Sequence, residues 1–348
     1  MKHKLVMVML SVALVVSLVL VGCAKPAPAP GPTPTPTPAP EVLNVKMGLF
    51  VAAGDHLAGA TNTIKFVEEA SGGRIKITLV PEDTVCPVAE HIDATGAGLF
   101  DLNWMWVAYY GETYPVLSLF NRPIGLREPG DAWGLDKQGG WDELAQEVWA
   151  KWNIHYIGHS PKKSDALVSR VPVPTIEDLK GLKVRSLELN AEAMESLGVS
   201  TVFLPPEECY TALSSGLIDA TDVYDLVTAY EVGLNEVAKY WVTPPLSAVV
   251  QSSFVANMDF WNSLSDADKH LIETSYLYAA QVNGHMLTSQ IKSALAEAQA
   301  KGVTVTQWSD ADQKKWGDAL AEVFERYPDD PEWTEAWELL QAYCEKIY

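Results

Sequence analysis

Residues 183–221 read KVRSLELNAEAMESLGVSTVFLPPEECYTALSSGLIDAT, and this stretch decides the fold class. Its pattern predicts strands over 183–186, 200–204 and 217–221, and helices over 191–197 and 205–215. Proline at the start of the second helix and Gly216 after its last residue are typical helix boundaries. This alternation predicts βαβ units, in which helices cover a mainly parallel sheet.

A second block with the same alternation lies nearer the amino terminus. Its pattern predicts strands over 42–50, 74–80 and 99–104, and helices over 57–70 and 88–97. The first of these helices ends at Ser71-Gly72-Gly73, where glycine can take the left-handed conformation that closes helices. Two separate blocks predict an α/β protein with two lobes, each built on a mainly parallel sheet flanked by helices.

The rest of the chain supplies connections between the lobes. Residues 109–138 are expected to be loop-rich, whereas the chain after Asn257 is expected to be helical. Ser265 and Asp268 have the spacing of an N-cap and its acidic third position, and the helical pattern continues to about residue 301. Some 36 residues of helix span roughly 55 Å, enough to bridge both lobes. We therefore assign residues 41–162 plus 251–290 to lobe I, and residues 163–250 plus 291–348 to lobe II.

The amino terminus has the features of an export signal. Residues 1–22 combine Lys2 and Lys4 with an uncharged, largely apolar run over 5–21. This pattern is typical of a secretory signal, and the run is at the short limit for the alternative, a membrane-spanning helix. It ends in Leu20-Val21-Gly22-Cys23, which resembles the bacterial lipobox. The resemblance implies cleavage before Cys23 and attachment of a lipid to its thiol.

A proline-rich segment follows the lipobox. Proline occupies every even position from 26 to 40, so this segment forms neither helix nor sheet and stays extended as polyproline II. At about 3.1 Å per residue, sixteen residues reach roughly 50 Å. Residues 23–40 are therefore expected to be a lipidated stalk that holds the folded part away from a membrane.

Composition excludes several classes of protein. The chain has 25 Lys and Arg against 45 Asp and Glu, a net charge of -20 that argues against a nucleic-acid partner. A mean hydropathy near zero excludes a polytopic membrane protein. Besides Cys23 there are three cysteines, Cys86, Cys209 and Cys344, so no disulfide framework can form and buried thiols are expected.

Signatures of catalysis are absent from the sequence. It contains no GxSxG, HExxH, CxxC, GxxxxGK[ST] or GxGxxG motif. Ser160 and Lys163 have SxxK spacing, but Pro161 follows the serine and no helix is expected there. His155 and His159 lie in an extended stretch, where their side chains would be about 13 Å apart and could not share one ion. We therefore predict that the protein is not an enzyme and carries no cofactor.

Several ordered segments resemble one family of transport receptors. Residues 174–185 (PTIEDLKGLKVR) are similar to the DctP-type solute receptors of TRAP (tripartite ATP-independent periplasmic) transporters. The same order continues with further matching segments, namely 71–75 (SGGRI), Leu197-Gly198, 210–213 (YTAL), 216–220 (GLIDA), and Asn257 with Trp261 and Leu264. Together these segments cover most of residues 42–270. The resemblance implies a two-lobed, periplasmic-binding-protein-like fold that closes around an organic acid and delivers it to a membrane permease.

Arg185 is the first candidate for a ligand-binding residue. The resemblance implies that this arginine, in the GLKxR motif, is the carboxylate clamp of the family. Its position leads to the same site, because open α/β sheets bind ligands at the carboxyl ends of their strands. The planar guanidinium also matches the two oxygens of a carboxylate. The alternative is an exposed arginine in a surface ion pair.

A second set of candidates follows the next strand. The resemblance implies that the position of Val223 touches the ligand, but valine cannot hydrogen-bond, so Asp222, Tyr224 or Asp225 could supply the polar contact instead. In the branch that binds 2-oxo acids, an acidic residue at the position of Asp222 helps to hold a cation, which implies Na⁺ or Ca²⁺ beside the ligand. The alternative is a solvated aspartate at a strand end. Ser164 stands where relatives contribute Gln or Arg, which implies a weakened second contact.

Aromatic residues stand at the end of the strand over 99–104 in the other lobe and just after it. Trp104, Trp106, Tyr109 and Tyr110 could wall a cleft and exclude water, or pack in the core. We expect core packing for at least two of the four, and we select Trp106 and Tyr109 as ligand walls.

These inferences predict an extracytoplasmic receptor, lipid-anchored to a bacterial membrane, that binds a small carboxylate such as a 2-oxo or hydroxy acid. Its predicted partners are this ligand and the subunits of a TRAP permease. A receptor for an ABC importer or a sensor system is the first alternative, and a secreted lipoprotein hydrolase is the second.

Overall fold

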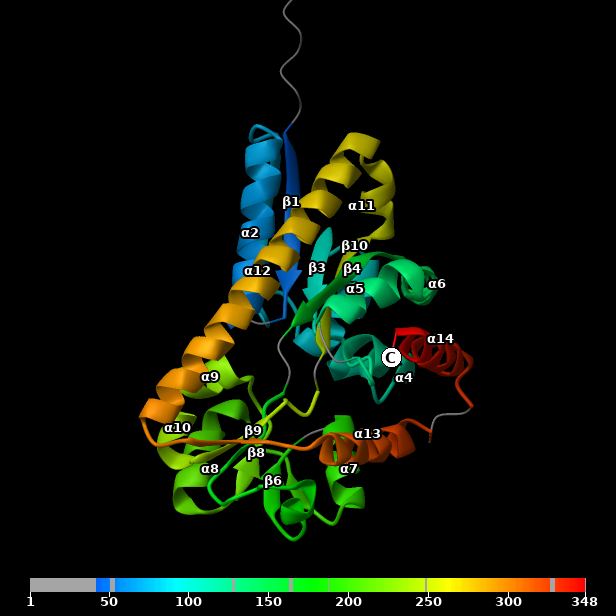
Figure 1. The fold of residues 1–348 in the computed structure, drawn as a ribbon. Coiled ribbons are helices and arrows are strands. Elements are labelled where there is room, and N and C mark those ends of the chain that lie inside the picture. The colour runs from blue at the N-terminus through cyan, green and yellow to red at the C-terminus, as the bar shows by residue number, and fades with distance from the viewer. Residues whose placement is uncertain are drawn as a thin grey trace, which may run out of the picture. The chain divides into compact units, whose positions relative to one another are not determined.

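The computed structural model describes residues 42–50, 54–126, 129–162, 165–186, 188–247, 249–325 and 329–347. The export signal, Cys23, the stalk and Ser164 lie outside these residues. The described chain contains two sheets (Figure 1). The first has the order β2 (Ile75–Val80), β1 (Leu43–Leu49), β3 (Leu102–Met105), β10 (Val250–Asn257), β4 (Ile154–Lys162). The second has the order β11 (Thr304–Gln307), β9 (Tyr240–Thr243), β5 (Val168–Ser169), β8 (Ala220–Thr221), β6 (Lys183–Arg185), β7 (Ser200–Val202).

Each predicted βαβ block forms one of these sheets, but the pairing is mixed. β1 runs parallel to β2 and β3, and β6 runs parallel to β7 and β8. In contrast, β10 is antiparallel to β3 and β4, and β5 is antiparallel to β8 and β9. The chain passes from the first sheet to the second between β4 and β5, and returns between β9 and β10. The strand before each crossing and the strand after the return run in opposite directions. The sheets therefore contain more antiparallel pairs than predicted.

Helices cover both faces of the first sheet. α2 (Gly54–Ala70) and α12 (Asp266–Ala300) contribute Ala60, Val67, Ile272 and Tyr276 to a core with Trp104 and Phe254. A second core includes residues of three further helices, α4 (Pro115–Asn121), α6 (Trp141–Ala150) and α14 (Pro331–Ile347), beneath which Tyr156 and Val255 lie. Shorter elements complete this part, namely η1 (Val88–Glu90), α3 (His91–Gly96), η2 (Val107–Tyr110), α5 (Pro129–Gln138) and α11 (Met258–Ser263).

The segment over residues 109–138 is more regular than predicted. Residues 109–138 were expected to be loop-rich, but they include α4 and α5. In α4, Val116, Leu117, Leu119 and Phe120 are all buried. A short helix that is buried on most sides lacks the alternation of apolar and polar faces by which helices are recognised.

The second sheet carries its own helices, namely η3 (Ile176–Leu179), α7 (Glu188–Ser196), η4 (Pro206–Glu208), α8 (Cys209–Ser215), α9 (Leu226–Glu231), α10 (Leu234–Val237) and α13 (Asp310–Phe324). The predicted end of α8 is confirmed, because Gly216 has φ +74° and its backbone N–H bonds back to the helix. α7 packs against α13. β6 and β8 are parallel neighbours, so their carboxyl ends lie at the same edge of the sheet.

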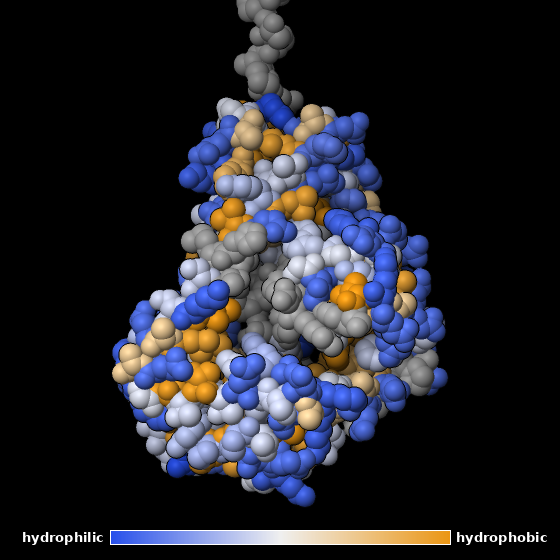
Figure 2. Space-filling view, viewed as in Figure 1, coloured by the Kyte–Doolittle hydropathy of each residue, from blue (hydrophilic) through white to orange (hydrophobic). Residues whose placement is uncertain are grey.

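The predicted bridging helix is confirmed in α12. Its N-cap is Ser265, whose hydroxyl accepts a hydrogen bond from the Asp268 N–H at 3.2 Å. α12 contacts α2 beside the first sheet and α9 beside the second, as Figure 1 shows. The end of the chain returns to the first sheet. α13 packs against α7 beside the second sheet, whereas α14 packs against α4 and α6 beside the first. Figure 2 shows polar and charged residues over most of the visible face, in keeping with the acidic composition.

Candidate functional site

Arg185 and Asp222 form the polar centre of the candidate site. Arg185 is the last residue of β6, and Asp222 directly follows β8, the parallel neighbour of β6. The two side chains therefore emerge at the same edge of the second sheet, where Nη1 of Arg185 lies 3.9 Å from Oδ1 of Asp222. Both residues are buried, with 3 % and 4 % of their surface exposed. A buried pair of charges at a strand end is characteristic of a binding site.

The guanidinium of Arg185 is fixed at one edge. Its Nε donates a hydrogen bond of 2.9 Å to the carbonyl oxygen of Leu204, and its Cζ lies 5.7 Å from the centre of the Phe203 ring. Because 3.9 Å is too long for a hydrogen bond, the Nη groups meet Asp222 through charge alone. Within the described residues the site thus presents a buried cation whose Nη donors are suited to a planar carboxylate.

The carboxylate of Asp222 is held by two neutral donors. Its Oδ2 accepts hydrogen bonds of 2.7 Å from Ser186 and 3.1 Å from the side chain of Asn190. Burial, and then the nearby charge of Asp165, raise the pKa of Asp222 to about 6, although Ser186, Arg185 and Asn190 act in the opposite direction. The free-energy cost of desolvating the ionised carboxylate is thus larger than the electrostatic stabilisation that it gains from Arg185 at 3.9 Å.

The other residues after β8 have different surroundings. Val223 and Tyr224 are half-buried, and burial raises the pKa of the Tyr224 hydroxyl. Asp225 is the N-cap of α9, where its carboxylate accepts hydrogen bonds from the N–H groups of Val227 and Thr228. Of the three polar residues considered beside Val223, Asp222 is therefore the one that contacts Arg185.

The aromatic candidates belong to the first-sheet layer. Trp104 and Tyr110 are buried in the core, whereas Trp106 is half-buried with its ring 5.6 Å from that of Phe50. Tyr109 is 58 % exposed. Trp106 and Tyr109 follow β3 and Arg185 ends β6, so these candidates come from different sheets, and a ligand wall from Trp106 and Tyr109 stays a prediction.

Sequence reasoning missed Ser186, Asn190 and Phe203. Ser186 directly follows the clamp arginine, so its place at the strand end was a usable signal. Asn190 lies one turn into α7 and Phe203 lies after β7, and neither belongs to a recognisable motif. Their roles depend on how three strand ends meet in space.

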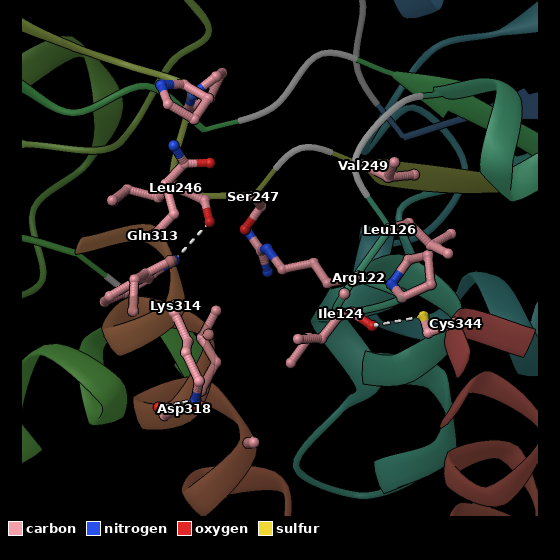
Figure 3. Close-up of a pocket in the computed structure, with 18 of the residues that line it drawn as sticks. Arg122, Ile124, Leu126, Leu246, Ser247, Val249, Gln313, Lys314, Asp318 and Cys344 are labelled. Carbon is pink, nitrogen blue, oxygen red and sulfur yellow. Dashed lines mark hydrogen bonds and ion pairs between the residues drawn. The ribbon is translucent and has the colours of Figure 1, made fainter. Parts of the chain in front are cut away.

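A cavity of about 670 Å³ lies elsewhere along the same sheet edge (Figure 3). One wall comes from the segment with Leu246 and from α13, and the other comes from Arg122, Ile124, Leu126 and α14. Neither Arg185 nor Asp222 is among its lining residues. In the strand order, the cavity adjoins β9 and β11, whereas the clamp adjoins β8 and β6. Among its polar side chains, Lys314 bonds Asp318 and Arg122 bonds Asp165, whereas the Nη groups of Arg185 make no hydrogen bond to Asp222, so we assign the site to the clamp.

The remaining sequence candidates for chemistry are structural. His155 is stacked on Trp261, and burial lowers its pKa to about 4. His159 is fully buried, with Nδ1 2.5 Å from the hydroxyl of Tyr156. Cys86, Cys209 and Cys344 form no disulfide within the described residues. Within the described ranges, His, Cys, Asp and Glu side chains form no group of three or more that could hold a metal ion.

Comparisons with known proteins identify the family and the fold. Residues 52–330 match the family of bacterial extracellular solute-binding proteins, family 7 (DctP). The chain is 26% identical to a monocarboxylate 2-oxoacid-binding periplasmic protein of Nostoc sp. over 295 residues, covering 83% of this chain and 80% of that protein. A TRAP periplasmic solute-binding protein of Rhodobacter sphaeroides, in an apo open structure, has a TM-score of 0.78 and 27% identity, and the match covers 87% of this chain and 98% of that one.

A third relative was solved with a ligand. The TRAP periplasmic solute-binding protein of Colwellia psychrerythraea, with bound calcium and pyruvate, has a TM-score of 0.77 at 21% identity, covering 88% of this chain and 95% of that one. At this identity the likeness concerns the fold.

Family and fold define an extracytoplasmic solute receptor rather than an enzyme. The chain belongs to the DctP family of TRAP-type solute-binding proteins. In the part of the chain that the structure describes, every helix is too short or too polar to cross a membrane.

Proposed function

We propose that this receptor binds a small organic acid through Arg185 and delivers it to a TRAP permease. The observation that carries the proposal is the burial of Arg185 at the end of β6, with Nη donors that Asp222 only approaches to 3.9 Å. The relative from Nostoc binds monocarboxylate 2-oxo acids, and the relative from Colwellia holds pyruvate, which supports a carboxylate as the ligand.

Binding would occur between two lobes built on the two sheets. Lobe I comprises residues 41–162 plus 251–290, and lobe II comprises 163–250 plus 291–348, with one change. Because α14 packs against α4 and α6, we place residues 331–347 with lobe I. Trp106 and Tyr109 would then approach the ligand from lobe I, and Arg185, Asp222, Tyr224 and Ser164 from lobe II. Ligand contacts from both lobes would stabilise a closed state that the permease recognises.

A bound carboxylate would bring a second negative charge next to Asp222. A cation beside Asp222 would compensate this charge, as the calcium in the pyruvate complex of the Colwellia relative suggests. Asp222 already accepts hydrogen bonds from Ser186 and Asn190 at Oδ2, which leaves Oδ1 as the oxygen that could contact Na⁺ or Ca²⁺.

The amino terminus would determine the location of the receptor. We propose that residues 1–22 are removed on export, that Cys23 carries the lipid, and that residues 23–40 form the stalk. The receptor would then contact the membrane through this anchor alone. Incorporation of labelled palmitate into the wild-type chain, and its loss in Cys23→Ser, would test the anchor.

A thermal-shift screen tests the proposed function directly. Mono- and dicarboxylates, 2-oxo acids and hydroxy acids would be added with Na⁺, with Ca²⁺ or with neither, because a ligand that binds the folded state raises the melting temperature. Stabilisation by at least one carboxylate is expected. Stabilisation by neutral sugars or cationic peptides, with no response to any carboxylate, would contradict the proposal.

A further inference from the structure

Arg122 joins the two sheet layers through one buried ion pair. It is the C-cap of α4 on the first sheet, and 6 % of its surface is exposed. Its Nε and Nη2 donate hydrogen bonds of 3.2 and 2.8 Å to Oδ2 of Asp165. Asp165 stands just before β5, where the chain enters the second sheet. Two charge-assisted hydrogen bonds to one oxygen define the position of this carboxylate closely.

Asn190 extends this contact to the clamp. Its side-chain Nδ2 lies 3.3 Å from Oδ2 of Asp165 and 3.1 Å from Oδ2 of Asp222, so the two carboxylates share one amide donor. Asn190 is 1 % exposed, and its fixed amide keeps the carboxylates a set distance apart. A continuous series of polar contacts therefore runs from Arg122 through Asp165, Asn190 and Asp222 to Arg185.

The series is balanced in charge. It contains two arginines and two aspartates, and all but Asp165 are nearly fully buried. Without Arg122, the negative charge of Asp165 would lose its arginine partner, and it would still lie close to the negative charge of Asp222. Uncompensated charge in a buried site is unfavourable, so the carboxylates would be expected to move apart or to draw in water.

The same ion pair lies where both crossing segments meet. The carbonyl oxygen of Asp165 accepts a hydrogen bond of 3.0 Å from the N–H of Leu246, which belongs to the returning segment. Figure 3 shows the Arg122 side chain extending from the end of α4 toward the segment with Leu246 and Ser247, at the side of the cavity. A rotation of one lobe against the other would therefore act on this contact.

We propose that Arg122 is a positioning residue for solute binding: it holds Asp165, and through Asn190 it fixes the Asp222 carboxylate against Arg185. This inference rests on the proposed function of Arg185 as the ligand clamp. In this role Arg122 acts through Asp165 and not by contact with the solute. Its role is to keep the clamp in one arrangement and to connect that arrangement with the first-sheet layer.

The test measures the NMR signal of the Arg185 side chain in the absence of a ligand. The chain has six arginines, so protein labelled with ¹⁵N-arginine gives a sparse spectrum of Nε–H groups, in which the Arg185 signal is identified by its loss in Arg185→Lys. In Arg122→Gln, the Arg185 signal is expected to shift by more than its line width. The matched control is Arg74→Gln, which removes the Arg74–Asp268 ion pair near the first sheet and should leave the Arg185 signal in place.

A double variant keeps the test valid if Arg122→Gln folds poorly. Arg122→Gln with Asp165→Asn removes both charges and should return the protein to wild-type thermal stability while the Arg185 signal stays displaced. An Arg185 signal that is unchanged in both Arg122 variants would overturn the positioning role. Failure of the proposed function has a different signature, since the wild-type chain would then bind no carboxylate whatever the spectrum shows.

The affinity measurement adds a second readout. With pyruvate as the probe, Arg122→Gln is expected to bind about tenfold more weakly than wild type, and Arg74→Gln to bind like wild type. Equal weakening in both variants would indicate a general loss of stability and would contradict a specific role for Arg122.

Discussion

Arg185 and Asp222 lie side by side at the ends of two parallel strands, with 3.9 Å between Nη1 and Oδ1. The arginine is held at Nε by the carbonyl of Leu204, and the aspartate is held at Oδ2 by Ser186. Each group is thus anchored on the side away from the other. Under the proposed function, the buried cation would receive an anion, and the negative charge beside it would limit which anions bind.

The first prediction concerns stability and pH at Asp222. Because burial raises the pKa of Asp222 to about 6, the folded chain binds this proton more tightly than the unfolded chain does. Ionised Asp222 therefore lowers the free energy of unfolding above about pH 6, and this cost disappears toward pH 4. Asp222→Asn, which mimics the neutral form, should raise the free energy of unfolding at pH 8 by on the order of 2 kcal/mol. Urea denaturation at pH 4 and pH 8 measures the difference.

Asp268 provides a control of opposite sign. The hydrogen bond with Arg74 lowers the pKa of Asp268, so its ionised form stabilises the folded chain above the unfolded pKa and this contribution is lost as the pH falls. Asp268→Asn should therefore reduce stability at pH 8 and have a smaller effect in acid. If both variants shifted stability in the same direction at pH 8, the account of Asp222 would be wrong.

A second prediction concerns the contact between β4 and α12. A Cβ atom added to Gly158 would lie 2.7 Å from Cε1 of Tyr276, whose ring is fully buried in the core. Gly158→Ala should lower the free energy of unfolding by about 1–3 kcal/mol, because the ring has little room to move. Thermal or urea unfolding gives the value.

Gly317 is the matched control for Gly158. It lies inside α13, and an added Cβ would meet nothing within 4 Å. Gly317→Ala should stabilise the protein by about 0.5–1 kcal/mol, since alanine favours helix over the unfolded chain. Equal destabilisation by both substitutions would show that the close contact with Tyr276 is not the cause.

A third prediction concerns the ring beside the clamp. Phe203 is 66 % exposed, yet its ring centre lies 5.7 Å from Cζ of Arg185. Phe203→Ala should weaken carboxylate binding by about 0.5–2 kcal/mol, because water would reach the guanidinium and the cation–π contact would be lost. Calorimetry on Phe203→Ala and Phe203→Tyr measures the loss of affinity. The tyrosine variant keeps an aromatic ring beside Arg185 and should bind more tightly than the alanine variant. Identical losses in both variants would exclude a role for the ring.

Local signals in the sequence predicted much of the fold. Ser265 and Asp268 predicted the start of α12, and Gly216 predicted the end of α8, because caps depend on neighbouring residues alone. The short strands β5, β9 and β11 carry two to four residues each and gave no usable pattern. Their pairing is decided by the crossing of the chain between the sheets, which periodicity does not reveal.

The site was predictable only in part. Arg185 stood in a recognisable motif at a strand end, and Asp222 followed the next strand. Arg122 and Asp165 are 43 positions apart, and Asn190 reaches both aspartates only because α7 begins beside two strand ends. Such contacts between distant segments require the structure.

The central claim is that Arg185 holds the carboxylate of the ligand, and calorimetry tests it most directly. The carboxylate found by the thermal-shift screen would be titrated into wild type, Arg185→Ala, and the control Arg170→Ala, in which an exposed arginine that pairs with Asp219 is removed. We predict that Arg185→Ala loses about 2–5 kcal/mol of binding free energy and that Arg170→Ala binds like wild type. Unchanged affinity in Arg185→Ala, with the protein folded, would contradict the claim.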